Sequence, residues 1–220
     1  VGVAIACRMM LTVYPDDALT LLGERRDALR TAMRRETRFG VGAAFARGER
    51  RSHAVLDDPD WTATPLLRSL RDKAAAQLGT SGTGNHFVDA GPLDVSDAGA
   101  AALGVAPGRF FALLTHSGSR GVGATIANHY SKLARTATPL RDELKSLAWL
   151  GLDTDEGQAY WTSMNLAGRF ASACHHTIHD ALSRTLGIEP VASVENHHNF
   201  AWIETVEVGG ERREAVVHRK

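Results

Sequence analysis

The chain has 220 residues, of which 44% are hydrophobic, and its 25 basic residues balance its 25 acidic ones. This length and apolar content suffice to bury a core in one domain, and they argue against a disordered chain. The longest apolar runs are far shorter than the roughly 20 residues that a membrane-spanning helix needs. The zero net charge neither indicates nor excludes a nucleic-acid partner, because a local groove of arginines such as Arg8 and Arg120 can bind phosphates while acids elsewhere balance them.

The first third of the chain predicts a strand, a helix and a connection. Residues 2–13 are rich in Val, Ile, Leu and Met and predict a buried strand. Asp16 and Asp17 then open a predicted helix to about Met33, whose arginines fall in its later turns, as the helix dipole favours. Residues 37–65 combine turn residues with charges and predict an exposed connection.

The rest of the chain alternates predicted helices and strands without an internal repeat. The clearest helix spans residues 157–186, where apolar side chains recur at steps of three and four, and Gly187 is placed to end it. The other predicted elements are strands at 85–88, 109–115 and 191–194 and helices at 65–78 and from residue 121. We therefore expect an α+β fold whose mixed or antiparallel sheet is flanked by helices.

The two cysteines, Cys7 and Cys174, have different surroundings. No signal-peptide pattern precedes them, so we expect a reduced, cytoplasmic protein. Cys174 falls on the apolar side of the predicted helix at 157–186, which indicates a buried and unreactive thiol. Cys7 ends an apolar stretch, and its thiolate is a candidate metal ligand.

Three histidines, His175, His176 and His179, lie on the predicted helix at 157–186. The spacing of His175 and His179 would allow both rings to hold one metal ion from a single helix face. The glutamate of an HExxH motif is missing, however, so we favour a solvated or partner-facing surface for these histidines.

Three further stretches place a histidine beside glycine, serine, asparagine or arginine at the edge of an apolar segment. They are LGTSGTGNHFVD (78–89), HSGSRGVG (116–123) and ENHHNFAW (195–202). An imidazole is a common ligand of transition metals, and neighbouring glycines let backbone N–H groups approach an anion. Together with Cys7 the three stretches predict a shared metal and phosphate site.

In the first two stretches, four side chains carry this chemistry. Asn85 can hydrogen-bond a nucleotide, and His86 can bind a metal. His116 ends a predicted strand and is followed by the Ser119 hydroxyl and by Arg120, whose planar guanidinium suits phosphate. Taken alone, the first stretch also fits a glycine turn before a strand with a core histidine, and the second also fits an ordinary strand-to-helix turn. Their joint occurrence favours a site.

In the third stretch, His197 and His198 are adjacent and point to opposite faces if the segment is extended, so only one of them is expected to reach a shared site. Asn199 can orient a phosphate or a ligand ring. By ligand softness alone, one cysteine with histidines suggests zinc.

The segments IACRM, GTGNHF, HSGSRG, HHNFAW and VHRK, in this order, resemble the RtcB family of RNA ligases. The resemblance implies an α+β core with the metal site at the sheet rim. It also implies an enzyme dependent on GTP and manganese that joins an RNA 3′-phosphate or 2′,3′-cyclic phosphate end to a 5′-hydroxyl end, in tRNA splicing or RNA repair. The family opens the cyclic phosphate, guanylylates a histidine, passes GMP to the 3′-phosphate and lets the 5′-hydroxyl displace it.

The resemblance also implies roles for particular residues. Cys7 resembles a thiolate shared by two Mn²⁺ ions, and Asn85 and Asn199 resemble asparagines that contact the guanine nucleotide. Arg120, with the neighbouring Ser119, resembles the phosphate-binding group. The implied histidine ligands of the metals are His86, His116 and His198.

Three features depart from the family pattern. Ala4 stands where the family has a metal-binding aspartate. The guanylylated histidine of the family lies beyond the VHRK segment, so no residue here is assigned as the catalytic nucleophile. Val1 stands only six residues before Cys7, where the family has a preceding segment. We therefore expect residues 1–220 to be a single central, catalytic-core fragment of a ligase, without the family's N-terminal segment and C-terminal nucleophile-bearing part. The alternatives are a non-catalytic metal- or nucleotide-binding module of the same family and a zinc-stabilised RNA-binding domain.

Overall fold

The computed structural model describes residues 5–219, and its central feature is a five-stranded sheet in the order β2-β3-β1-β4-β5, in which every neighbouring pair is antiparallel. The strands are β1 (Cys7–Tyr14), β2 (Phe87–Val95), β3 (Gly108–Ser117), β4 (Ala192–Val208) and β5 (Glu211–Arg219). The α-helices are α1 (Arg26–Glu36), α2 (Pro65–Gln77), α3 (Asp97–Leu103), α4 (Arg120–Ala137) and α5 (Asp155–Leu186). Short 3₁₀ helices are η1 (Asp16–Leu22), η2 (Arg47–Glu49), η3 (Ala54–Asp57), η4 (Pro59–Thr62) and η5 (Asp142–Leu147).

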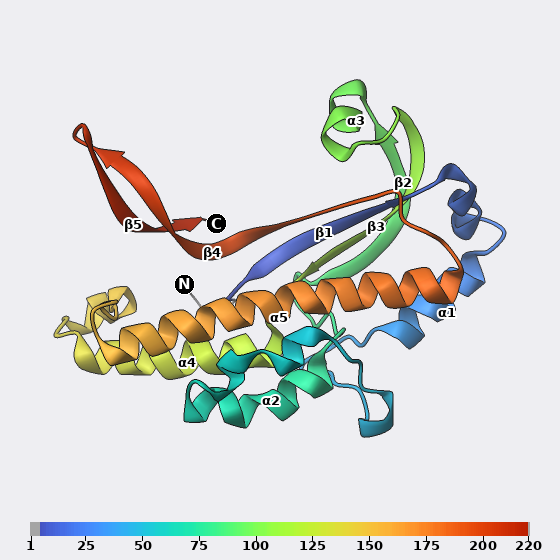
Figure 1. Ribbon diagram of the computed structural model, residues 1–220. Helices are drawn as coiled ribbons and strands as arrows, with labels where there is room; N and C mark the ends of the chain where they lie inside the picture. Colours follow the sequence, from blue (N-terminus) through green and yellow to red (C-terminus); the bar gives the residue numbers. More distant parts are fainter. Residues whose placement is uncertain (1–4, 220) are drawn as a thin grey trace.

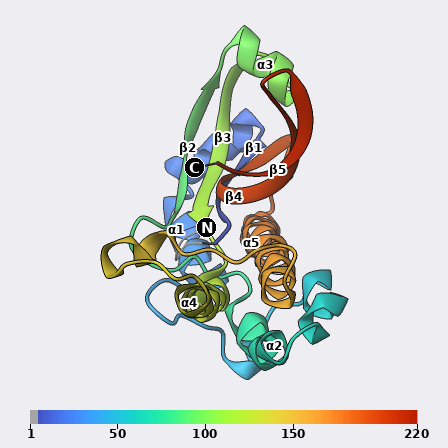
Figure 2. The same cartoon turned by 90° about the vertical axis from the view of Figure 1, so that its left-hand side faces the viewer.

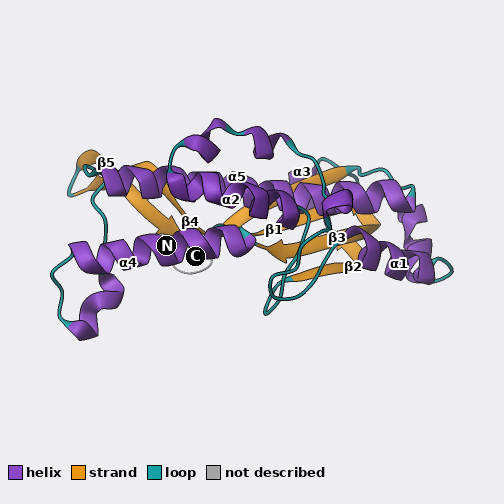
Figure 3. Cartoon of the chain, turned by 90° about the horizontal axis from the view of Figure 1, so that it is seen from below, coloured by secondary structure: helices purple, strands orange, loops and turns teal. Residues whose placement is uncertain are grey.

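The helices gather on one side of the sheet. Figure 1 shows α5 running under β1 and β3, with α4 and α2 lower in the view. Figure 2 shows α4 beside α5 beneath the sheet and α2 below both, and Figure 3, from below, shows α4 and α5 side by side in front of the strands. The hairpin of β4 and β5 lies above the N-terminal end of α5 (Figure 1). The opposite face of the sheet at β1 and β3 is thus not covered by these helices.

Two apolar clusters hold the layers together. One lies among α2, α4 and α5 and includes Trp61 and Phe170, whose ring centroids are 6.3 Å apart in an edge-on arrangement. The other lies between the sheet and the C-terminal half of α5 and includes Tyr14, Phe111 and Leu182, all fully buried. Because α5 contributes to both clusters, its apolar side chains recur along its whole length.

These observations confirm the α+β class. Of the two expected sheet arrangements, mixed and antiparallel, the protein has the antiparallel one. The helix predicted for residues 157–186 is confirmed as α5, and Gly187 ends it in the left-handed conformation (φ 66°). Cys174 is fully buried, as expected, and burial raises the pKa of its thiol to about 12. No helix of residues 5–219 combines the length and the apolar character needed to span a bilayer.

The structure differs from expectation between residues 16 and 65. The predicted helix from Asp16 to Met33 is divided into η1 and α1 around Gly23, since glycine disfavours a continuous helix. The connection at 37–65 is not simply exposed, because Phe45, Val55 and Trp61 are buried in it. The Trp61 indole N–H donates to the Val55 carbonyl (2.7 Å), which fixes the segment against α2 and α5.

The strand predicted at 191–194 is the beginning of a much longer β4, which turns at Gly209 and Gly210 into β5. Both glycines have positive φ (64° and 85°), as a tight type I′ hairpin turn requires. The glycine pair, with alternating apolar and polar residues on either side of it, is the sequence signal from which this hairpin could have been predicted. The short helix α3 was also not expected.

The histidines on α5 correct a prediction, because His175 and His179 are buried and only His176 is half-exposed. Threonine hydroxyls on the sheet explain the burial. Thr115 Oγ1 lies 2.5 Å from His175 Nδ1 and 2.9 Å from His179 Nε2, and Thr12 Oγ1 lies 2.7 Å from His179 Nδ1. The i, i+4 spacing thus turns both rings toward β1 and β3, where hydroxyls contact three of their four nitrogens, while His175 Nε2 is buried without a hydrogen-bond partner among residues 5–219.

Burial makes these two rings a source of acid sensitivity. It lowers the pKa of His175 from 6.5 to about 4 and that of His179 to about 3, so both rings are neutral in the folded protein. As the pH falls below 6.5, the unfolded chain takes up protons first, and stability falls toward pH 4. We expect each histidine to contribute up to about 1.4 kcal/mol per pH unit to this loss.

Urea unfolding between pH 8 and pH 4 tests this expectation with the double variant His175→Gln/His179→Gln. The double variant should show a shallower fall of unfolding free energy with decreasing pH than the parent chain. The control His176→Gln should not reduce the slope, because the bond to Glu195 raises the pKa of His176. An unchanged slope in the double variant would contradict the assignment.

Candidate metal centre

Three strands bring the predicted ligands to one end of the sheet. His116 in β3 pairs with Met9 of β1 on one side and with Phe87 of β2 on the other. Thr115, the residue before His116, contacts α5, and successive residues of a strand point to opposite faces. His116 therefore lies on the face opposite α5, together with its paired residues Met9 and Phe87. In β4 the register shifts, because Cys7 pairs with Asn199 whereas Arg8 pairs with His197. This β-bulge leaves His198 as the extra residue opposite the beginning of β1.

Cys7, His116 and His198 form a compact group of metal-binding atoms. Cys7 Sγ lies 3.0 Å from His116 Nε2, which lies 2.7 Å from His198 Nε2. All three ligand atoms are within 4.8 Å of one another, and Cys7 and His116 are buried. A thiolate and two imidazoles at this spacing can share one transition-metal ion.

His86 also lies close to the Cys7 sulfur. Its Nε2 is 3.6 Å from Cys7 Sγ, and its Nδ1 is 3.2 Å from Arg120 Nη1. Burial and the charge of Arg120 lower the pKa of His86 to about 4, so the ring is neutral. Because Arg120 can only donate to Nδ1, the proton of the neutral ring lies on Nε2, which would have to lose it to bind a metal ion beside Cys7. Burial raises the pKa of Cys7, an effect that a nearby cation would oppose.

A backbone carbonyl fixes the His116 ring. His116 Nδ1 lies 2.8 Å from the Asn85 carbonyl oxygen, which can only accept, so Nδ1 carries the proton. Nε2 is then left with its lone pair directed at the Cys7–His198 group. Asn85 thus acts here through its backbone. The residue is exposed and directly precedes His86, just before β2.

Arg120 is held beneath the glycine-rich loop that leads to His86. Arg120 Nε donates to Thr80 Oγ1 (3.1 Å), and a Cβ at Gly82 would lie 2.0 Å from Arg120 Nη1. Gly82 (φ 107°) is therefore needed both for its conformation and for the space that the guanidinium occupies. The glycines of this loop were noted in the sequence, but Thr80 was not recognised as a partner.

The side chains of Ser119 and Asn199 form hydrogen bonds with other residues of the chain. The buried Ser119 hydroxyl donates to the Ile5 carbonyl (2.5 Å), which ties the start of α4 to the approach of β1. Asn199 Oδ1 accepts from His218 Nε2 (2.9 Å), and the Asn199 carbonyl accepts from Ala6 N–H (3.1 Å). Both residues border the site and hold its strands together.

Arg8, one of the arginines that could have lined a phosphate-binding groove, is instead paired within the fold. It is 6% exposed and its guanidinium lies 2.8 Å from the Glu195 carboxylate on the α5 side of the sheet. Burial alone would raise the pKa of Glu195, but the contact with His176 and the charge of Arg8 lower it to about 2. His197 lies on this side too, 3.3 Å from Arg8 Nη1 and stacked on Phe200. The ion pair with Glu195 was not predicted.

Mutation can distinguish His116, a proposed metal ligand, from His176, which lies on the other side of the sheet. We expect His116→Ala to weaken binding of a divalent transition metal by at least about 100-fold, since losing even an outer partner of a ligand costs 10- to 100-fold. His176→Ala should leave the affinity nearly unchanged, because His176 pairs with Glu195 on the other side of the sheet. Isothermal titration calorimetry measures both; equal losses in the two variants would count against the site.

The space under the loop gives a second prediction. Gly82→Ala should lower the unfolding temperature more than Gly84→Ala. Both glycines have positive φ, so both substitutions carry strain of about 1–2 kcal/mol. Only the alanine at 82 also displaces Arg120, since a Cβ at Gly84 meets nothing within 4 Å. Differential scanning calorimetry of the two variants checks this, and equal Tm values would show that Arg120 does not depend on Gly82.

Comparisons with known proteins agree with the motifs. The family model of the tRNA-splicing ligase RtcB matches residues 59–220. The chain is 29% identical over 196 residues to RNA-splicing ligase RtcB homolog 1 of Entamoeba dispar, covering 83% of this chain and 36% of that protein. For the tRNA-splicing ligases RtcB of Pyrococcus furiosus and Aeropyrum pernix, the identities are 30% over 182 residues and 29% over 204. These alignments cover 74% and 82% of this chain but 18% and 42% of the two relatives. The chain thus spans less than half the length of these relatives, and since the family match extends over most of it, the chain belongs to the RtcB family.

Proposed function

We propose that this chain is the metal-binding centre of a cytoplasmic RNA ligase. The reaction would join an RNA 3′-phosphate or 2′,3′-cyclic phosphate end to a 5′-hydroxyl end at the expense of GTP, in tRNA splicing or RNA repair. The observation that carries the proposal is the convergence of Cys7, His116 and His198 at one end of the sheet, in a chain of the RtcB family. Two relatives are named as tRNA-splicing ligases, which supports RNA as the partner.

The donor set fits transition metals, and two ions can be accommodated by one sulfur. Cys7 with His116 and His198 would hold one ion, and Cys7 with His86 would contribute to the other. Cysteine and histidine by themselves favour zinc, so the assignment of Mn²⁺ rests on the family resemblance. When bound, such cations neutralise phosphate charge and stabilise in-line phosphoryl transfer.

The residues around the ligands have supporting roles in this proposal. The Asn85 carbonyl fixes the tautomer of His116, which keeps Nε2 free to bind metal. Arg120, beside His86, offers guanidinium donors to a phosphate at the mouth of the site, and Ser119 holds the helix that carries Arg120. The side chains of Asn85 and Asn199 would contact the guanine nucleotide. No residue of the chain is assigned as the histidine that accepts GMP.

A non-catalytic metal- or nucleotide-binding module is the second candidate. It is favoured by Ala4, which replaces the metal-binding aspartate of the family pattern and lies outside the described residues. The loss of a carboxylate ligand removes both an oxygen donor and a negative charge, which would weaken one of the two ion sites.

Titration of the chain with Mn²⁺ by calorimetry, with and without GTP, distinguishes these candidates when an Ala4→Asp variant is included. The ligase proposal predicts that aspartate restores a second Mn²⁺ equivalent and that GTP binds only when Mn²⁺ is present. The control Cys7→Ala should lose both ions, because its sulfur is shared. Absence of specific Mn²⁺ and GTP binding in the parent and in Ala4→Asp would overturn the proposal.

A further inference from the structure

The charges of this neutral chain are unevenly distributed. Nine arginines and three carboxylates lie between residues 25 and 51, so this stretch carries a formal charge of +6 and the remainder of the chain carries −6. The stretch covers α1 and the connection that follows it. Such a concentration of guanidinium groups attracts an anionic partner even when the total charge is zero.

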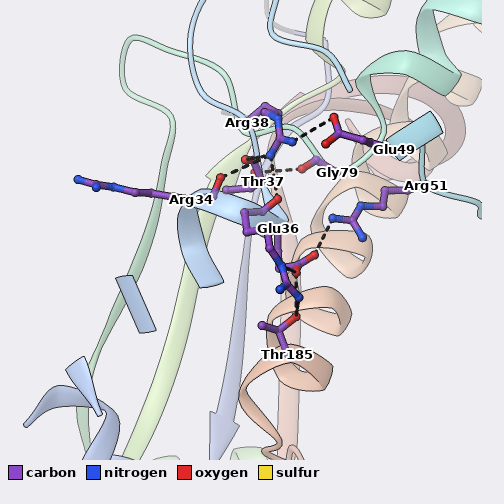
Figure 4. Close-up of polar contacts among 9 residues, drawn as sticks. Arg34, Glu36, Thr37, Arg38, Glu49, Arg51, Gly79 and Thr185 are labelled. Atoms are coloured by element: carbon purple, nitrogen blue, oxygen red, sulfur yellow. Dashed lines mark hydrogen bonds and ion pairs between the residues drawn. The ribbon is translucent and has the colours of Figure 1, made fainter. Parts of the chain in front are cut away.

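Part of this charge is used within the fold, and part is free. Arg51 and Arg35 contact the buried Glu36 carboxylate, and Arg38 contacts Glu49. In contrast, Arg34 and Arg47 are exposed and make no side-chain hydrogen bond or ion pair at contact distance with any residue from 5 to 219, although the charge of Arg47 acts on the exposed Asp72 carboxylate. Figure 4 shows the Arg34 side chain extending away from the polar contacts around Glu36.

Two apolar side chains are exposed between these arginines. Phe39 is 49% exposed and Val41 is 91% exposed, and both lie in the segment that follows α1. The neighbouring Phe45 is buried, and the guanidinium carbons of Arg38 and Arg51 lie 4.6 Å and 5.0 Å from its ring centroid. An exposed phenylalanine in a segment that also carries exposed arginines is typical of surfaces on which nucleobases stack. We call Arg34, Phe39, Val41 and Arg47 the 34–47 surface.

Contacts at both ends hold this segment in place. Glu36 is 5% exposed and also accepts from Thr185 at the end of α5 (2.8 Å), while the Thr37 hydroxyl donates to the Gly79 carbonyl (3.0 Å; Figure 4). Because the backbone beside Phe39 is fixed by buried polar contacts, its ring is presented without a large ordering cost on binding.

The 34–47 surface also borders the candidate metal centre. Gly40 N–H donates to the Gly82 carbonyl (2.7 Å), Ser81 N–H donates to the Arg38 carbonyl (3.0 Å), and Phe39 forms a β-bridge with Gly82. Gly82 in turn lies against the Arg120 guanidinium, which contacts His86. The surface is therefore joined through one loop to the proposed phosphate and metal ligands.

We propose that the 34–47 surface binds single-stranded RNA next to the end that enters the metal centre, with Arg34 and Arg47 on phosphates and Phe39 stacked on a base. This inference rests on the proposed function, since it supplies the path of the same RNA. Phosphates alone would need only the arginines; the exposed ring at a fixed backbone position indicates a partner that carries bases as well.

Fluorescence anisotropy with a labelled single-stranded RNA that ends in a 3′-phosphate tests the proposal in the presence of Mn²⁺. Arg34→Gln/Arg47→Gln should raise the Kd at least tenfold and reduce the slope of log K against log salt by about 1.4, because each phosphate contact contributes roughly 0.7. Phe39→Ala should raise the Kd at least about fivefold without changing the salt slope. The matched control Arg135→Gln, at an exposed arginine of α4, should bind like the parent.

The possible outcomes separate the two proposals. RNA binding by the parent chain that is equally strong in the double variant, in Phe39→Ala and in Arg135→Gln would overturn the surface assignment and leave the proposed function standing. A parent chain that does not bind the RNA would overturn both. Binding of anionic phosphatidylserine vesicles without binding of RNA would also overturn the inference, and Tm values close to that of the parent show that the variants are folded.

Discussion

The alternation of side chains across the antiparallel sheet is the constraint on which the rest of the structure depends. In three pairs of residues that are adjacent in the sequence, this alternation places one residue at the candidate metal centre and turns the other toward α5. The pairs are Cys7 and Arg8, His116 and Thr115, and His198 and His197. Cys7, His116 and His198 are therefore each one peptide away from a residue that makes polar contacts on the α5 side of the sheet.

These contacts form a polar layer between the sheet and α5. Arg8 donates to the Gly168 carbonyl of α5 and pairs with Glu195, while Thr115 contacts the rings of His175 and His179. The Arg8–Glu195 ion pair is partly buried and contributes little net stability, but removing Glu195 would leave the buried Arg8 charge unpaired, which is costly. The pair thus favours the register in which β1 and β4 meet. The backbone is also strained beside the site, because Ala6 (φ 60°) and Arg120 (φ 55°) adopt the left-handed conformation.

The sequence was most informative where one physical signal dominated. The apolar period of α5 and the glycine after it predicted a helix that the structure confirms, and the burial of Cys174 followed from the same pattern. The division of His197 and His198 between two faces could be expected from strand geometry alone. Burial of His175 and His179 could not, because it depends on Thr12 and Thr115, which lie more than 50 residues away along the chain. Likewise, nothing local to Arg8 indicated that Glu195 would neutralise it.

The central claim is that Cys7, His116 and His198 bind a metal ion together. A crystal of the chain grown with Mn²⁺ and measured at a wavelength with manganese anomalous scattering tests this claim most directly. The account predicts an anomalous peak at bonding distance, about 2.0–2.5 Å, from the Cys7 sulfur and from the Nε2 atoms of His116 and His198. A peak elsewhere with none at these three atoms, at saturating Mn²⁺, would contradict it.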